Sequence, residues 1–167
     1  HLEKLEAGVS VVQIVGEFED KLNAADLTLL IQKPETPVYV MADGRHFWRV
    51  IDNLMKNICK YAQPGTRVYV DLRENGVGKD GEGKDAEVIF RNTSRYPLNI
   101  SSEELMERFV RGDESRNTEG SGLGISIAKS LMELMGGSFM LYVDGDLFKV
   151  VLGFAQMEEE KEPLDED

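Results

Sequence analysis

The sequence predicts an α/β (α+β) two-layer sandwich, with a mixed, mostly antiparallel sheet that carries its helices on one face. The first observation is that strand patterns come in successive pairs, within 27–43, 66–92 and 138–156, with helical patterns between the pairs. The second is that 167 residues, 41% of them hydrophobic, suffice for one domain with a substantial core. Such elements bury their apolar faces most simply in two layers.

The first half of the chain supplies two helices and two strands. The opening HLEKLEAG follows a helical pattern, and apolar residues at helical spacing continue it from Val11 to Leu22. LTLLIQKP and PVYVMAD then predict two strands joined by a turn at Pro34 and Pro37. The strongest helical pattern follows over residues 44–62 and is stopped by Pro64 and Gly65.

The second half contains two hairpins and a second long helix. Strands are predicted at 66–75 and 85–92, a short helix at 102–109 within a polar segment, and a helix from Leu123 to Met135 that ends at Gly136-Gly137. Two final strands, 138–145 and 147–156, precede an acidic tail at 157–167 that we expect to be disordered. The loop 76–84 holds GKDGEGK, but a strand follows where a P-loop needs Ser or Thr and a helix, so this is a hairpin loop.

The charge excludes one class of partner. With 19 basic and 31 acidic residues the formal net charge is -12, and there is no basic stripe of the kind that binds a nucleic acid backbone. The longest apolar run near the start, 9–15, is too short to span a bilayer, so we expect no membrane contact by this fragment.

The helix predicted at 44–62 carries two different stripes. Its apolar stripe is expected to face the sheet and consists of Phe47, Val50, Ile51, Leu54 and Ile58. A second stripe at i, i+4, i+7 and i+8 consists of Asn53, Asn57, Lys60 and Tyr61. Asn is a poor helix former, but it offers a neutral oxygen to a hard cation and an NH₂ donor. This stripe indicates a metal and phosphate site, and a solvated face that happens to hold two asparagines stays the alternative.

Glycines precede the second long helix, in EGSGLGISIAKSLMELMGG. Small residues at a helix N-terminus let backbone amides approach an anion, where the helix dipole adds to the attraction. A dinucleotide-binding fold would need a strand leading into this turn, and the polar RGDESRNTEGSG precedes it instead. On its own the turn is equally compatible with a flexible loop.

Together these motifs resemble the histidine kinase branch of the Bergerat-type ATP-binding fold shared with gyrase, the Hsp90 chaperones and MutL. DNLMKNICKYA resembles the asparagine box of that family, MERFVRGDESR its phenylalanine box around Phe109, and GSGLGISIAKSLMELMGG its second glycine box. The three motifs occur in the order and spacing of the family, and the resemblance covers residues 11–156.

The resemblance implies ATP and Mg²⁺ as ligands and a role for each matching residue. Asn57 is expected to ligate the magnesium, and the rest of its stripe to support the phosphates. Arg111 and Arg116 are expected to reach the γ-phosphate from a mobile lid at about 97–121. The triphosphate would be lined, and the lid hinged, by Gly120, Gly122, Leu123 and Gly124.

Two positions carry more specific expectations. In the ATP-hydrolysing relatives a water-activating Glu stands four residues before the metal-binding Asn. In this sequence Asn53 occupies that position, and its amide cannot act as a general base. The first glycine box of the family is Asp-x-Gly-x-Gly, whose Asp accepts a hydrogen bond from the adenine amino group. The matching RNTSRYPLNIS has no glycine and has Asn92 in the Asp position, so weak nucleotide binding is expected.

We therefore interpret the chain as the ATP-binding catalytic domain of a two-component sensor histidine kinase. It is expected to transfer the γ-phosphoryl group to a histidine on a separate dimerisation domain, for relay to a response regulator receiver domain. Residues 1–10 would be the remnant of the dimerisation domain and 11–156 the catalytic domain, inert without its acceptor and forming the cytoplasmic part of a membrane-bound sensor. Two alternatives stay open: a degenerate nucleotide-sensing module without kinase activity, and a serine kinase of the anti-sigma type.

Overall fold

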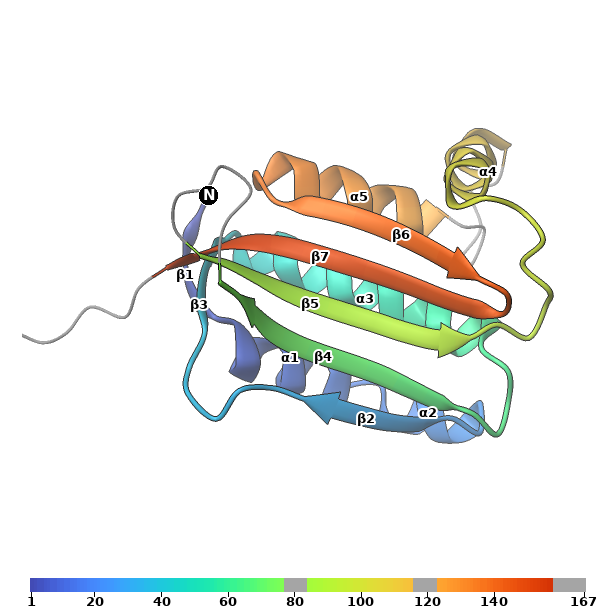
Figure 1. Ribbon diagram of the computed structural model, residues 1–167, viewed down its shortest axis with the longest axis horizontal. Coiled ribbons are helices and arrows are strands. Elements are labelled where there is room, and N and C mark those ends of the chain that lie inside the picture. Colours follow the sequence, from blue (N-terminus) through green and yellow to red (C-terminus); the bar gives the residue numbers. More distant parts are fainter. Residues whose placement is uncertain (77–83, 116–122, 158–167) are drawn as a thin grey trace, which may run out of the picture.

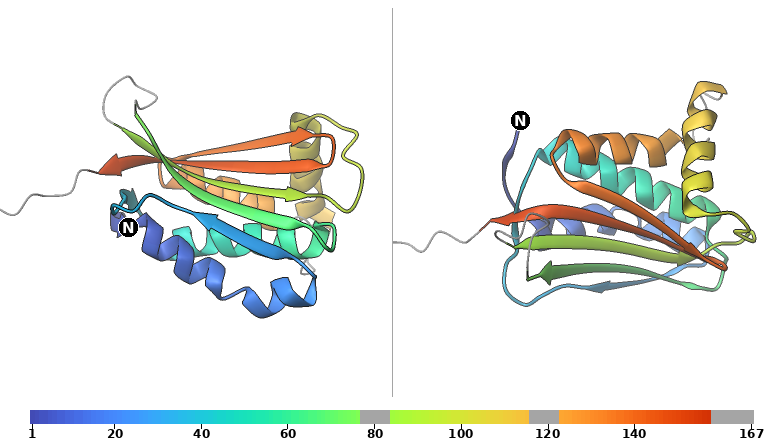
Figure 2. Two further views of the ribbon diagram at one scale, coloured as in Figure 1. Left: turned by 60° about the horizontal axis from the view of Figure 1, so that its bottom comes forward. Right: turned by 45° about the horizontal axis from the view of Figure 1, so that its top comes forward.

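The predicted two-layer architecture is confirmed. The computed structural model describes residues 1–76, 84–115 and 123–157, with side chains described except at 111–115 and 123. Helices cover one face of a seven-stranded sheet (Figure 1), and the two layers are separated clearly in the left view of Figure 2. The strands are β1 Glu3–Glu6, β2 Thr28–Gln32, β3 Tyr39–Ala42, β4 Arg67–Asn75, β5 Asp85–Thr93, β6 Ser138–Asp144 and β7 Leu147–Met157. The helices are α1 Ala7–Gly16, α2 Glu19–Ala24, α3 Gly44–Tyr61, α4 Ser102–Ser115 and α5 Leu123–Leu134.

The sheet is mixed, with strand order β1-β3-β7-β5-β4-β2 and with β6 paired to β7. β2 runs parallel to β4, and the other pairings described are antiparallel. The expectation that β2 and β3 form a pair joined by a turn is wrong, because β2 lies at one edge beside β4 while β3 lies between β1 and β7. An alternating pattern shows which residues of a strand face the core, and it contains no information about the neighbouring strand.

The helical prediction for the opening residues is also wrong. Glu3–Glu6 forms a strand that pairs with β3, because Leu5 can pack against the core from that edge. The helix starts only at Ala7, where the Glu6 carboxylate accepts hydrogen bonds from Gly8 N at 3.1 Å and Val9 N at 2.6 Å. Ala7 is fully buried. Residues 3–7 therefore contribute to the sheet and the core.

The helix expected from Val11 to Leu22 is broken into α1 and α2. The break falls at Glu17 and Phe18, and the Phe18 ring is buried, only 3% exposed. Phe18 and Leu22 are both buried, at 3% exposure each, so the apolar pattern that predicted this segment still marks the residues that face the core.

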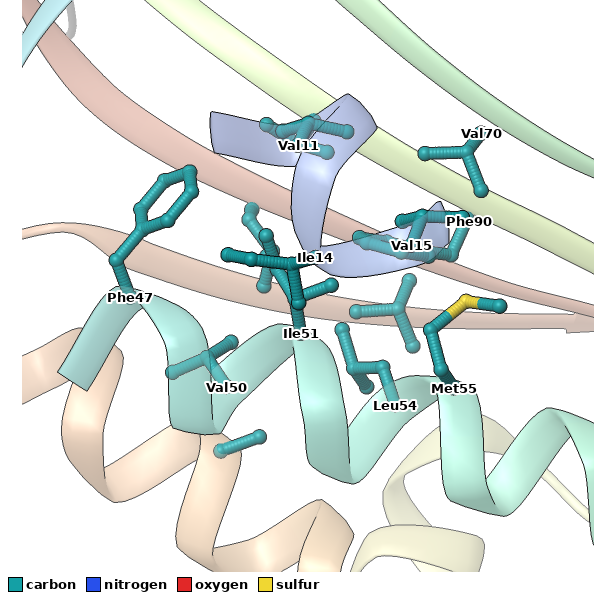
Figure 3. Close-up of a cluster of buried hydrophobic side chains, with 14 of the residues drawn as sticks. Val11, Ile14, Val15, Phe47, Val50, Ile51, Leu54, Met55, Val70 and Phe90 are labelled. Carbon is teal, nitrogen blue, oxygen red and sulfur yellow. The ribbon is translucent and has the colours of Figure 1, made fainter. Parts of the chain in front are cut away.

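The core lies between α1, α3 and the inner face of the sheet. The apolar stripe of α3 is buried as predicted, and Met55 joins it. In Figure 3 Phe47, Ile51 and Met55 point from α3 toward Val11, Ile14 and Val15 of α1 and toward Val70 and Phe90 of the sheet. Burial of this apolar stripe fixes the rotation of α3 about its axis. The direction in which the polar residues of α3 point is therefore fixed as well.

The C-terminus of α5 is confirmed at the glycine pair. Gly136 has a positive φ of 78°, a conformation that side chains rarely adopt, and Gly137 N donates to Met132 O at 2.9 Å. A Cβ on Gly137 would lie 2.5 Å from the carbonyl oxygen of Gly153, so the turn between α5 and β6 can pass this close to β7 only with glycine at position 137.

Helix α4 is longer than predicted. It runs from Ser102 to Ser115 where only 102–109 was expected, because Gly112 lowers the helical propensity without ending the helix. Its first turn is capped by Ser101, whose Oγ accepts from Glu104 N at 3.2 Å. The helix lies at a corner of the molecule, beside the N-terminal end of α5 (Figure 1). The predicted loop at 76–84 and the acidic tail fall mostly on 77–83 and 158–167, outside the described residues.

Candidate nucleotide-binding site

The polar stripe of α3 faces the start of α5. A Cβ added to Gly124 would lie 3.3 Å from Asn53 Cβ and 3.5 Å from Asn53 Oδ1. The structure therefore brings Asn53 and Gly124 together, although they lie 71 positions apart in the sequence. At this contact the first turn of α5, whose backbone N–H groups have no partner within the helix, lies against the asparagine stripe.

The Asn53 amide carries an unsatisfied donor. Its Nδ2 is buried, and no group in the described part of the chain accepts a hydrogen bond from it. A buried donor without a partner costs about 1–3 kcal/mol. An anionic oxygen bound between α3 and α5 would remove that cost, as expected of a phosphate.

The C-terminal end of α3 is joined to the end of β5 by backbone hydrogen bonds. Gln63 N donates to Thr93 O at 2.8 Å, Arg95 N donates to Tyr61 O at 2.8 Å, and Ala62 pairs with Ser94 as an isolated bridge. This connection places the last two turns of α3 beside the end of β5.

The rest of the stripe lies on these last two turns. Asn57 and Tyr61 are half-buried and Lys60 is exposed. The Lys60 Nζ lies over the ring of Tyr61, 5.2 Å from the ring centroid. The ammonium group is thus held near the stripe and toward solvent, where it can meet a phosphate.

Asn92 is the second-to-last residue of β5. Alternate residues of this strand face the helices and are buried, including Val88 and Phe90, and Asn92 continues that series with 5% exposure. Its Oδ1 is buried and accepts no hydrogen bond from any described group. An acceptor without a donor in an apolar layer is what a site for a ligand N–H requires.

The aromatic ring of Phe109 anchors α4 next to Asn92. Its centroid lies 6.5 Å from that of Phe148, and the ring planes meet at 85°, edge to face. Phe148 is in turn the register partner of Asn92 on β7. The sequence interpretation did not single out Phe148. Its inward position was readable from the alternation in β7, but its closeness to Phe109 and Asn92 was not.

The remaining predicted residues are placed only in part. Arg111 lies on α4, two residues after Phe109, and Leu123 is the first residue of α5, but their side chains are not among those described. Arg116, Gly120 and Gly122 also fall outside the described residues.

One other titratable group on α3 bears on the chemistry. Burial raises the pKa of the Cys59 thiol, although the nearby Lys21 acts in the opposite direction. A raised pKa keeps the sulfur protonated and so argues against a nucleophilic cysteine on this helix.

The described groups fit a magnesium nucleotide. Mg²⁺ takes oxygen ligands, so the neutral amide oxygen of Asn57 suits it beside phosphate oxygens. The buried Nδ2 of Asn53 on α3 and the buried Oδ1 of Asn92 on β5 each lack a hydrogen-bond partner among the described groups, so each can bind a group of the nucleotide.

Comparison with known proteins agrees with this geometry. The family model for histidine kinase-, DNA gyrase B- and HSP90-like ATPases matches residues 42–161. The chain belongs to this family. The match includes α3, β5, α4 and α5, and thus every element of the candidate site.

Individual relatives are sensor kinases. The chain is 28% identical over 144 residues to the probable sensor kinase SilS of Salmonella typhimurium, a match that covers 84% of this chain and 28% of SilS. It is 32% identical over 117 residues to the probable sensor protein PcoS of Escherichia coli, a match that covers 68% of this chain and 24% of PcoS. The chain thus spans about a quarter of the length of these curated relatives.

Solved structures support the fold. The catalytic domain of histidine kinase ThkA, in a nucleotide-free form, matches with a TM-score of 0.72 at 16% identity, over 93% of this chain and 97% of that one. The mycobacterial sensor histidine kinase MprB matches with a TM-score of 0.71 at 20% identity, over 93% and 98%. The predicted family and fold class, a histidine kinase type of ATP-binding catalytic domain, are confirmed. Within the described residues, no helix has the length and apolar character needed to cross a bilayer.

Proposed function

We propose that this chain binds MgATP and donates its γ-phosphoryl group to a histidine on a separate dimerisation domain, for relay to the receiver domain of a response regulator. The observation that carries the proposal is the asparagine stripe of α3 held against the start of α5, with the Asn53 donor buried and unpaired among the described groups. The sensor-kinase relatives support the same reaction. We also propose that the domain works in the cytoplasm as part of a membrane-bound sensor.

In this proposal the residues of the chain bind and position the substrate. Asn57 holds the Mg²⁺ ion, which when bound neutralises phosphate charge and orients the γ-group. Asn53 donates to a phosphate oxygen, and Lys60 and Arg111 add positive charge, with Tyr61 beside them. Gly124 lets the backbone of α5 approach the phosphates. Arg116, Gly120, Gly122 and Leu123 complete this phosphate site.

The base lies at the other end of the site. Asn92 accepts a hydrogen bond from the exocyclic amine, and Phe148 and Phe109 provide the apolar surroundings. Since Asn53 cannot act as a general base, water is not activated next to the γ-phosphate and the group is kept for the acceptor histidine.

One observation is also compatible with a second function, a nucleotide-sensing module without kinase activity. Asn92 is neutral where a carboxylate would bind the amine more strongly, since a hydrogen bond to a charged group is about twice as strong. Weak nucleotide binding is compatible with a kinase that works at millimolar ATP and with a sensor of the nucleotide level.

The test has two parts. The 167-residue chain is titrated calorimetrically with a non-hydrolysable ATP analogue, with and without magnesium. Binding that depends on magnesium is expected, and no binding at millimolar nucleotide contradicts the proposal. The protein with its own dimerisation domain is then incubated with γ-labelled ATP. Label on a histidine supports the kinase, whereas binding without transfer supports the sensing module.

A further inference from the structure

The side chain of Asn92 is a polar group with apolar neighbours near the C-terminal end of β5. It is 5% exposed, its register partner is Phe148, and the ring of Phe109 packs edge-on against Phe148. Its Oδ1 is buried and receives no hydrogen bond from the part of the chain that the structure describes. Burying such a group without a partner costs free energy, so the position is suited to a ligand that supplies the partner.

A carboxamide and a carboxylate read different ligands at such a position. A carboxylate only accepts hydrogen bonds, whereas the amide of Asn accepts through its oxygen and donates through its NH₂ group. Rotation of the amide by half a turn about its last bond exchanges the two ends without changing the shape of the side chain. An Asn can therefore pair with the 6-amino group of adenine in one orientation and with the 6-oxo group of guanine in the other.

We propose that Asn92 makes the site tolerant of the purine base, so that guanine nucleotides bind about as well as adenine nucleotides. This inference rests on the proposed nucleotide site, because it concerns the base of the same ligand. It makes Asn92 a specificity-determining residue: the amide pairs with both bases, whereas an ionised carboxylate at 92 would repel the guanine oxygen and leave it unpaired.

The wild-type chain and one nearly isosteric variant test the proposal. The 167-residue chain is titrated at pH 8 with magnesium and the non-hydrolysable imido analogues of ATP and GTP. For the wild type we expect the two dissociation constants to agree within about tenfold. In Asn92→Asp the guanine analogue should bind at least about thirtyfold more weakly than the adenine analogue, because the carboxylate accepts from the amine and cannot donate to the oxygen. Burial of the new carboxyl at position 92 would raise its pKa and favour the neutral form. The titration is therefore done at pH 8, where this carboxyl is ionised.

A matched control separates base reading from overall charge. Asn75→Asp introduces the same chemical change at the far end of β4, where Asn75 is exposed and pairs in register with Asp85, seven residues before Asn92 on β5. Asn75→Asp should weaken the binding of both analogues equally or not at all, and the ratio of their dissociation constants should stay unchanged. A second variant, Asn92→Leu, keeps the size and removes all hydrogen bonding. It should weaken both analogues about tenfold, and it decides the matter if Asn92→Asp does not fold.

The outcomes separate the inference from the proposed function. Base tolerance is supported if the dissociation constants of the two analogues agree within about tenfold for the wild type and differ more widely for Asn92→Asp. A wild-type preference for adenine above about tenfold overturns it, and so does a ratio that is the same in Asn92→Asp, or affinities unchanged in Asn92→Leu. If the ATP analogue itself fails to bind the wild type, the proposed function fails. If it binds while the GTP analogue is rejected, only this inference fails.

Discussion

Two stripes of one helix contrast within this molecule. The apolar stripe of α3 is almost completely buried, with Phe47, Ile51 and Leu54 at 2% exposure or less, and it packs against α1 and the sheet. The polar stripe lies on a different face of α3. Its residues are half-buried except for the exposed Lys60, and Asn53 lies against the start of α5 with an amide donor that has no partner among the described groups. The first stripe finds its contacts within the chain, whereas the second leaves a polar group for a ligand to bind.

The contrast shows how one helix serves stability and binding separately. Burial of the apolar stripe holds α3 in a fixed orientation, and this orientation places the asparagines. The asparagines are therefore positioned by residues that never touch the ligand, and they can be changed without loss of the core. Four experiments break or sharpen this separation.

The largest effect is expected from Asn57→Ala. If the amide oxygen holds magnesium, its loss should reduce phosphoryl transfer by about a thousandfold or more, because the charge of the phosphates is no longer screened. Stability should be unchanged or slightly higher, since Ala is the better helix former and Asn57 lies outside the apolar stripe. Labelled phosphate on the acceptor histidine and thermal unfolding measure the two effects. Wild-type transfer rates in a normally folded variant would show that the stripe is only a surface.

Leu54→Ala should have the reverse effect. Leu54 is 2% exposed, so the cavity left by the substitution should lower the free energy of unfolding by about 3 kcal/mol. At temperatures where the variant stays folded, nucleotide affinity should change little. Urea denaturation and calorimetric titration of the same sample check both values. A loss of affinity as large as that of Asn57→Ala would contradict the separation of the two stripes.

Gly124→Ala should combine both effects on a smaller scale. The added methyl group would lie 3.3 Å from Asn53 Cβ, so α5 or Asn53 must shift by a few tenths of an ångström. We expect the affinity for the ATP analogue to fall about tenfold, or ~1.4 kcal/mol. The free energy of unfolding should change little, because the gain in helical propensity is offset by the shift that the methyl group requires. Ser130→Ala, on an exposed position of the same helix, is the control and should leave affinity unchanged. Tighter binding in Gly124→Ala would show that the close approach has no role.

The smallest effect concerns the start of α3 and depends on pH. The backbone N–H of His46, followed by the terminal amino group of His1, lowers the pKa of the Asp43 carboxyl from 3.8 to about 2. Because the pKa is depressed in the folded state, the stabilisation by Asp43 is complete above pH 3.8 and is lost as the pH falls toward 2. Asp43→Asn keeps a capping side chain but does not titrate. Its unfolding temperature should therefore fall less steeply between about pH 4 and pH 2 than that of the wild type. Parallel curves would exclude a contribution from this cap.

Much of the fold was predictable because it depends on local patterns. The period of α3 separates its apolar and polar stripes whatever the tertiary structure, and Gly136 ends α5 because its φ of 78° suits glycine. The motifs around Asn53, Asn57 and Gly124 identified the family, and the family model confirms it.

The errors lie where long-range packing decides. Glu3–Glu6 has a helical pattern but forms a strand, since β3 offers it backbone partners from a distant part of the chain, such as Val40 opposite Leu5. β2 pairs with β4 and β3 pairs with β1 and β7, so neither takes the other as its partner. Helix α4 continues through Gly112.

The candidate site divides in the same way. The sequence alone determined which residues form the polar stripe of α3, because helical geometry relates residues three and four apart without reference to the rest of the chain. Only the tertiary structure decided what meets that stripe: Gly124 against Asn53, and Phe109 on Phe148 beside Asn92. These contacts join segments distant in sequence, and their positions follow from how the helices and the sheet bury their apolar faces together.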